Sequence, residues 1–429
     1  MYPNLYYVFK DWFGVELKPL SFLNTFGFMV AMGFIASAIA ISSELKRKEK
    51  QGLLLPREEY ITVGRPASIL DLLINFFTGF LFGYKLIGLF LNKPDDISPQ
   101  TYIFSGEGNL AAGLILGLGL AGLKWWEKNK QKLKEPEQRV LRIWPHDRVG
   151  DIVVISLVFG IIGAKLFDNF ENWDDFLKHP IERIFSAGGL TFYGGLIVAA
   201  IALGVYAYKK NIRLVHLADA IAPAMLVAYA VGRIGCQVAG DGDWGIYNSA
   251  YITDENNGKA MLAKPGEYEA RLEKYKTHFL EGERRSVNLA SVPHKSIIAP
   301  SFLPTWMVAY SYPQNVNKDG VKMAYLSDEH DRALPVPVFP TPFYETVISA
   351  ILFLILWSVR KRIKIAGVMT GLYLVVNGVE RFMIEKIRVN NQIPFFGFQL
   401  SQAEIISFCL IIGGILLILY LSLTKSRQA

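Results

Sequence analysis

The sequence predicts an all-α, polytopic integral membrane protein with about nine transmembrane helices. Of its 429 residues, 52% are hydrophobic, and the mean hydropathy is +0.27. Apolar runs of about 18–24 residues recur along the chain, long enough to cross a bilayer core as helices. A soluble chain of this length would instead divide into domains with alternating polar and apolar patterns.

The spans divide the chain into four regions. Residues 1–19 are expected to form an outer amphipathic arm, not a cleavable signal peptide, because they lack a basic start. Spans 1–6 occupy 20–240, a long outer (periplasmic) insertion occupies 241–340, and spans 7–9 occupy 341–429. The nine predicted spans are 20–42, 68–91, 108–126, 149–167, 188–208, 216–236, 342–359, 366–385 and 401–423.

Loop charges orient these helices. Lysines and arginines concentrate in every second loop, as at 46–65, 128–148, 209–213 and 360–364. Because basic loops stay in the cytoplasm, the N-terminus is predicted outside and the C-terminus inside. The net charge of +7 therefore belongs to the cytoplasmic loops, and no nucleic-acid partner is predicted.

Two of the spans resemble each other. Residues 71–90 and 151–170 share Asp, Gly, Lys, Leu and Phe in register at an offset of 80 residues. The similarity indicates either a parallel duplication or a chance likeness between apolar helices. In each copy a lysine, Lys85 or Lys165, lies near the outer end. Either these lysines snorkel to the head groups, or Lys165 binds a lipid phosphate.

Ionisable and phenolic side chains gather at the predicted outer helix ends. A charged residue at the centre of a membrane helix costs about 2.5–3.5 kcal/mol, so arginines within a span are candidates for function. Arg381, Glu385 and Arg388 are expected on one helical face, at i, i+4 and i+7. Interfacial anchoring is the alternative reading, strongest for Tyr193, Tyr344 and Arg388. The group comprises Tyr193, Arg233, Tyr344, Glu345, Arg381, Glu385 and Arg388.

These residue types suit an anionic lipid head group. Two guanidinium forks at Arg233 and Arg381 would hold a phosphodiester, while Glu345 and Glu385 orient them or accept a proton. Glycine clusters at 186–195 and 232–245 allow a bulky head group to approach the backbone. No metal site or cofactor is predicted. Cys236 and Cys409 are expected to be small buried apolar residues without a disulfide.

Four motifs carry a family resemblance. GRIGCQVAGDGDWG at 232–245 is similar to GRxGNFxNxExxG, and FPTPFYE at 339–345 resembles HPSQLYE. ERFMIEKIR at 380–388 resembles a second Arg–Glu helix end, and GFMVAM at 27–32 a first-span motif. Through these motifs the chain resembles the prolipoprotein diacylglyceryl transferase family.

The resemblance implies an activity and its site. The family transfers diacylglyceryl from phosphatidylglycerol to the lipobox cysteine of prolipoprotein signal peptides, forming a thioether in the bacterial cytoplasmic (inner) membrane, with the active site facing the outer leaflet. Phosphatidylglycerol, prolipoproteins and membrane lipids are therefore the expected partners. The expected catalytic residues are Arg233, Arg381, Tyr193 and Glu345; the expected substrate-binding residues are Gly189, Gly194, Gly195, Lys165, Gly240, Asp241, Tyr344 and Glu385.

Two departures from the family pattern leave alternatives open. Tyr193 stands where the family loop has histidine, and a phenol with an ordinary pKa of about 10 is a poor base at neutral pH. Tyr193 therefore either positions the lipid by a hydrogen bond or acts as a perturbed base. Ala239, Gly240 and Asp241 replace the Asn-x-Glu region of the signature. The rival functions are a non-catalytic lipid-binding or scaffold protein, or a transporter.

Overall fold

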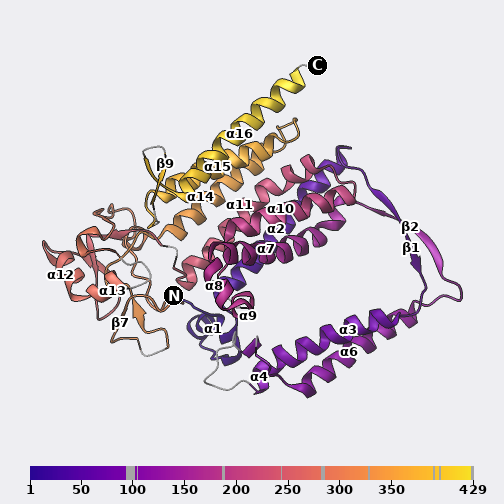
Figure 1. Cartoon of the computed structure of the whole chain (residues 1–429), viewed down its shortest axis with the longest axis horizontal. Coiled ribbons are helices and arrows are strands. Elements are labelled where there is room, and N and C mark those ends of the chain that lie inside the picture. Colours follow the sequence, from indigo (N-terminus) through magenta and orange to yellow (C-terminus); the bar gives the residue numbers. More distant parts are fainter. Residues whose placement is uncertain are drawn as a thin grey trace. The chain divides into compact units, whose positions relative to one another are not determined.

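Long apolar helices dominate the computed structural model, which describes residues 1–92, 102–103, 105–185, 189–242, 244–281, 286–326, 329–389, 392–395 and 398–426 (Figure 1). Among these residues, eight helical segments are long and apolar enough to cross a membrane, which confirms a polytopic helical membrane protein. They are α2 (Thr25–Lys50), α3 to α4 (Ile69–Asn92), α6 (Leu110–Lys130), η3 with α7 (Pro145–Glu171), α10 (Phe192–Lys209), α11 (Leu214–Ala239), α14 (Thr341–Val359) and α16 (Gln402–Ser426).

The remaining predicted span, the eighth at 366–385, is also helical. It forms α15 (Val368–Glu385), which is not among the eight segments of sufficient length and hydropathy. Its last turns carry Glu380, Arg381 and Glu385. The number of crossings and the predicted orientation therefore stay predictions.

The chain forms two compact units, one made of Met1–Leu45 with Leu214–Ala429 and the other of Lys46–Arg213. In the first unit, α15 packs along α16 and α11 along α14. Asp219 of α11 accepts hydrogen bonds from the amides of Gly367 and Thr370, at 2.8 and 3.0 Å. A buried carboxylate at the start of α15 satisfies amides that have no partner within a helix.

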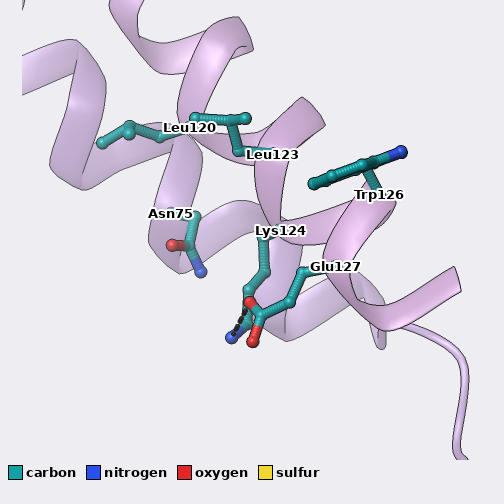
Figure 2. A pocket seen from close by; sticks show the side chains of 6 residues that line it. All are labelled: Asn75, Leu120, Leu123, Lys124, Trp126 and Glu127. Carbon is teal, nitrogen blue, oxygen red and sulfur yellow. Dashed lines mark hydrogen bonds and ion pairs between the residues drawn. The ribbon is translucent and has the colours of Figure 1, made fainter. Parts of the chain in front are cut away.

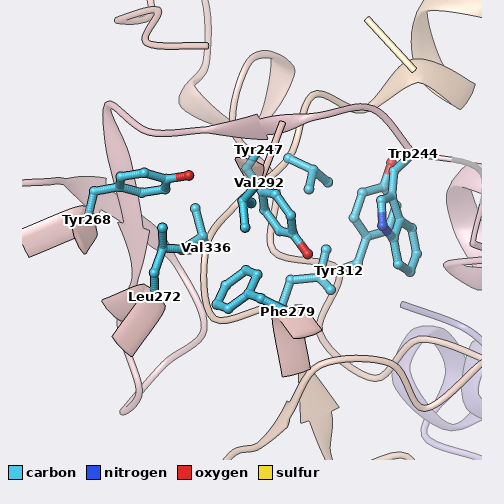
Figure 3. Packing of buried hydrophobic residues seen from close by; sticks show 10 residues of the cluster. Trp244, Tyr247, Tyr268, Leu272, Phe279, Val292, Tyr312 and Val336 are labelled. Carbon is cyan, nitrogen blue, oxygen red and sulfur yellow. The ribbon is translucent and has the colours of Figure 1, made fainter. Parts of the chain in front are cut away.

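Short strands and helices between α11 and α14 build a polar domain that the all-α prediction did not anticipate. Its strands are β3 (Tyr247–Asn248), β4 (Tyr251–Thr253), β5 (Ala260–Leu262), β6 (His294–Lys295), β7 (Val321–Lys322) and β8 (Arg332–Ala333), and its helices are α12 (Glu267–Lys274) and α13 (Lys276–Glu281). Figure 3 shows its core, which is rich in aromatic rings such as Trp244, Tyr247 and Tyr312. The 240–340 region therefore has a hydrophobic core of its own.

The amino-terminal arm is helical. Helix α1 (Leu5–Phe13) ends at Gly14, whose left-handed backbone stops the helix. Trp12 and Phe13 are 68% and 63% exposed. These rings suit the predicted place of the arm on a membrane surface, which stays a prediction.

The second unit contains a two-stranded ribbon that connects its helices. Strand β1 (Arg57–Val63) leads into α3, and strand β2 (Glu137–Ile143) leads into α7 by way of η3. The strands pair antiparallel with Tyr60 opposite Val140, which are 80 residues apart. The ribbon is thus centred on one pair of residues with the offset of the two predicted copies, and each strand precedes one copy.

Both copies continue as a helical hairpin, α3–α6 (Ile69–Leu81 and Leu110–Lys130) and α7–α10 (Val149–Glu171 and Phe192–Lys209). In each hairpin, the amide just before the second helix donates to a carbonyl of the first helix. Asn109 donates to Tyr84 at 2.9 Å, and Thr191 donates to Ala164 at 3.1 Å. Tyr84 and Ala164 are again 80 residues apart. The matched contacts favour duplication over chance likeness.

The two repeat lysines also have matching contacts. Lys85 donates to carbonyls of the segment before α6, including that of Glu107 at 2.7 Å. Lys165 donates to the carbonyl of Arg183 at 3.2 Å, in the segment before α10. Each lysine thus ties its hairpin connection to the first helix.

Candidate active site

One buried glutamate at the start of α14 is the counter-charge of three arginines. Glu345 has no exposed surface, and its Oε2 lies 2.9 Å from Nε of Arg233. Nη1 of Arg381 and Nη1 of Arg388 lie 3.4 and 3.5 Å from its Oε1. A carboxylate out of contact with water is costly to bury unless cations and hydrogen bonds compensate it. Glu345 therefore holds guanidinium groups from three parts of the chain around one point.

Tyr229 completes this cluster, one turn before Arg233 on α11. Its hydroxyl donates to Oε1 of Glu345 at 2.9 Å and accepts from Nε of Arg233 at 3.1 Å. Because the Nε hydrogen points to Tyr229, the Arg233–Glu345 contact is an ion pair without a hydrogen bond. The guanidinium carbon also lies 5.2 Å from the centre of the tyrosine ring. Sequence reasoning missed Tyr229, although its i−4 spacing from Arg233 was a signal.

At the end of α15, Arg381 is held a second time. Its Nη2 lies 3.0 Å from Oε2 of Glu385, the i+4 contact that the spacing predicts. Ser401 donates to the other oxygen of Glu385 at 2.6 Å. The predicted common helical face is wrong for Arg388, because α15 ends at Glu385. Arg388 is instead placed by a β-bridge to Gly245.

Gly245 brings two segments of the cluster together. A Cβ at this position would lie 2.6 Å from the carbonyl oxygen of Ile387 and 3.0 Å from that of Phe339. The Gly245 amide donates to the Phe339 carbonyl at 2.8 Å. Only a residue without a side chain allows this close approach. The final glycine of the 232–245 motif thus has a structural reason.

Gly240 and Asp241 cap α11. Gly240 has a left-handed backbone (φ +68°), and the amide of Asp241 donates to the carbonyl of Cys236 at 3.0 Å. A glycine in this conformation with a six-to-one hydrogen bond is a common way to end a helix. The predicted role of these two residues in substrate binding stays a prediction.

Tyr344, next to Glu345, has a partner in the polar domain. Its hydroxyl donates to the carbonyl of Met307. This contact fixes the first turn of α14 against the 240–340 region. Its predicted place in substrate binding stays a prediction.

The two cysteines differ in burial. Cys236 is buried, and its Sγ lies 3.6 Å from Nη1 of Arg233. Cys409 is exposed, so its predicted burial is wrong: it lies on a side of α16 that the described residues leave uncovered. Neither cysteine forms a disulfide.

The remaining predicted residues lie in the Lys46–Arg213 unit. Gly194 and Gly195 belong to α10 and not to a loop, because the helix begins at Phe192. A Cβ on Gly194 would lie 2.3 Å from Cβ of Phe167, and one on Gly195 would lie 2.8 Å from the carbonyl oxygen of Gly160. Both glycines therefore let α10 pack closely on α7.

Lys165 and Gly189 take part in the connection between α7 and α10. Arg183 donates to Oδ2 of Asp168 at 3.0 Å and accepts at its carbonyl from Lys165. Gly189 has φ +69°, and a Cβ there would lie 2.4 Å from the same Asp168 oxygen. Residues 186–188 of this glycine cluster lie outside the described residues. Tyr193 is half-buried in the first turn of α10.

The predicted site residues thus divide between the two units: Arg233, Arg381, Glu345, Glu385, Tyr344, Gly240 and Asp241 in one, and Tyr193, Lys165, Gly189, Gly194 and Gly195 in the other. Their meeting in one cavity stays a prediction. A shallow hollow of roughly 340 Å³ lies elsewhere, on the α3–α6 hairpin. Figure 2 shows the side chains that line it. It is lined by residues such as Asn75 and Trp126, and by none of the predicted site residues.

The fold and the cluster define a polytopic helical membrane protein with an arginine–glutamate site where three helices end or begin. The sequence profile of the family described as prolipoprotein diacylglyceryl transferase matches residues 110–420. The chain belongs to this family. The match omits residues 1–109, which include the first copy's strand and its first helix.

Several named proteins are similar to this chain. Phosphatidylglycerol–prolipoprotein diacylglyceryl transferases from Streptococcus uberis and Streptococcus agalactiae are 28% and 26% identical to it. The matches cover 64% and 72% of this chain, and 78% and 88% of the two relatives. The Finegoldia magna protein of the same name is 27% identical over 62% of this chain and 76% of its own length.

Proposed function

We propose that the arginine–glutamate cluster binds the phosphate of phosphatidylglycerol in a diacylglyceryl transfer to the lipobox cysteine of a prolipoprotein. The chain is a transferase of lipoprotein biosynthesis, as its family and named relatives support. The observation that carries the proposal is the attachment of Arg233 and Arg381, on different helices, to one buried carboxylate. Such a clamp is preorganised before substrate arrives.

The transfer forms one bond and breaks another. The cysteine thiol first releases its proton to water. The thiolate sulfur then attacks the diacylglyceryl carbon that bears the phosphate ester, a C–S bond forms, and the C–O bond breaks. Glycerol phosphate leaves with the electron pair, and its charge grows as the bond opens. Each arginine guanidinium can donate two parallel hydrogen bonds to phosphate oxygens, and it stays charged. The two arginines therefore stabilise the leaving group where its negative charge develops.

Glu345 does not touch the reacting atoms in this proposal. It sets the spacing of the guanidinium groups, with Tyr229 bridging Glu345 and Arg233. Glu385 does the same for Arg381 from the opposite side.

Tyr193 acts in this proposal through its hydroxyl, which places the lipid head. The thiol, with an ordinary pKa of about 8.5, is mostly protonated at neutral pH, and nearby guanidinium charge favours the thiolate.

The reaction takes place in the bacterial inner membrane, at the outer leaflet. The cluster supports a site at one membrane face, because Arg233, Glu345 and Arg381 all lie near helix ends. A transport pathway would instead place polar groups through the middle of the bundle.

The direct test incubates the purified protein with phosphatidylglycerol and a peptide that carries a lipobox cysteine. The expected result is a peptide heavier by one diacylglyceryl group on the cysteine, with equimolar release of glycerol phosphate. A peptide in which serine replaces the cysteine is the control and should stay unmodified. Lipid binding without any mass increase, under conditions where a family member turns over, would indicate a non-catalytic lipid-binding protein.

A further inference from the structure

The polar domain has an apolar loop on its surface, although it has a packed core of its own. In residues 297–306, called here the 297–306 loop, Ile298 and Phe302 are 65% and 80% exposed. Ile297 and Trp306 in the same loop are 36% and 38% exposed. Large apolar side chains gathered on one exposed segment mark a contact with a partner or a membrane.

Two contacts place this loop at the beginning of a membrane helix. The ring of Trp306 lies against that of Phe343, with centroids 4.9 Å apart and planes at 70°. The carbonyl of Met307 accepts from the hydroxyl of Tyr344. Phe343 and Tyr344 lie in the first turn of α14, a candidate membrane span. The loop therefore sits at the level where α14 enters the bilayer, where tryptophan is enriched.

The charge of the surrounding sequence suits an anionic surface. No aspartate or glutamate occurs between Glu283 and Asp319, a stretch that includes the whole loop. His294 and Lys295, just before the loop, are exposed. Anionic head groups attract basic residues beside a membrane and are repelled by acidic ones.

We propose that the 297–306 loop inserts into the leaflet on the polar-domain side of the membrane, with Ile298 and Phe302 among the acyl chains. The partner is an anionic lipid surface, and the inserted side chains anchor the polar domain beside α14. Because Met307 follows the loop directly, the anchor also fixes the carbonyl that holds Tyr344, the neighbour of Glu345.

The test measures the depth of one nitroxide label at a time. Phe302→Cys is labelled in a Cys236→Ser/Cys409→Ser background and reconstituted in vesicles of phosphatidylglycerol and phosphatidylcholine. The matched control is Ala270→Cys, an exposed position on the polar helix α12. At position 302 we expect greater relaxation by oxygen than by a water-soluble nickel complex, and at position 270 the reverse. Equal nickel accessibility at the two positions would overturn the proposal.

A second label at Ile298 guards against a local effect of replacing Phe302, and the same result is expected there. A prolipoprotein peptide is then added to both labelled proteins. If the labels lie in water without the peptide and become immobile only with it, the loop binds the peptide and the membrane assignment is wrong. Insertion that is unchanged by the peptide supports the lipid surface.

Discussion

Replacing Arg233 with lysine separates the charge of the cluster from its geometry. Lysine keeps the positive charge beside Glu345. Arginine donates from Nε to Tyr229 and can donate from its two terminal nitrogens to a phosphate at the same time, and a single ammonium group cannot do both. Each hydrogen bond to a charged group contributes about 1.5–3 kcal/mol. Loss of two such bonds in the transition state lowers kcat/KM by a factor of about 10² to 10⁴.

Arg388→Lys is the matched control, because Arg388 meets the same glutamate by a single contact of 3.5 Å. A lysine replaces one long hydrogen bond more easily, so the expected loss is about fivefold, or roughly 1 kcal/mol. Both variants keep the charge balance around Glu345, so their melting temperatures in one detergent should stay close to that of the parent. Glu345→Gln should melt lower, since removing one partner of a buried ion pair costs about 3–5 kcal/mol.

The assay is the rate of mass gain on a lipobox peptide at saturating and limiting phosphatidylglycerol. The reasoning fails if Arg233→Lys turns over at nearly the parent rate, because the fork geometry then contributes nothing. It also fails if Arg388→Lys loses as much activity as Arg233→Lys at an unchanged melting temperature. In that case any guanidinium beside Glu345 would be equivalent.

The other predictions concern single positions. Tyr193→Phe should lower transfer by about 10–100-fold if the hydroxyl positions the lipid, and Tyr193→His should retain activity; a fully active phenylalanine variant would leave only an anchoring role. Cys236→Ser and Cys409→Ser should retain transfer, because a serine oxygen at 236 still accepts from Arg233 and Cys409 lies exposed on α16; a lipid adduct trapped on either cysteine would contradict this. Gly163→Ala should destabilise the α7–α10 hairpin by about 1–3 kcal/mol, since its Cβ would lie 2.5 Å from the Gly194 carbonyl oxygen. Gly160→Ala, with nothing within 4 Å of its Cβ, is the control and should be neutral or stabilising in thermal unfolding.

Hydrophobic length predicted the helices well, because burial of an apolar run in a bilayer needs no knowledge of its neighbours. Predicted span 216–236 corresponds to α11 (Leu214–Ala239), and 342–359 to α14 (Thr341–Val359). The short strands of the polar domain were missed, since β3 and β6 pair residues far apart in the sequence and each strand has only two residues. Such short runs carry no periodic signal.

The candidate site was predictable where charge stands out against an apolar background. Arg233, Arg381 and Glu345 were conspicuous for that reason, and the structure joins them. Tyr229 was not conspicuous, because a tyrosine within an apolar helix usually reads as packing. Arg388 was expected on the helix of Arg381, but the helix ends before it, and a backbone bridge to Gly245 places it.

Glycines were the residues whose chemistry the sequence explained least. Gly194 and Gly195 suggested room for a head group, yet each lies where a side chain would meet helix α7. Gly83 in the first copy does the same for α6, because its Cβ would lie 2.2 Å from the carbonyl oxygen of Ala112. A motif glycine can therefore reflect helix packing and substrate access alike, and sequence alone does not separate the two.

Comparison of the two hairpins separates these roles. Counted from the residues before the second helices, Asn109 and Thr191, Tyr193 corresponds to Ala111 in the first copy. The first copy keeps the close helix packing, the lysine and the backbone hydrogen bond, but has a methyl group where the second has a phenol. The features that both copies share are thus those that the hairpin needs in order to fold. What only the second has, above all the Tyr193 hydroxyl, is the part of this hairpin that we predict to act on the lipid.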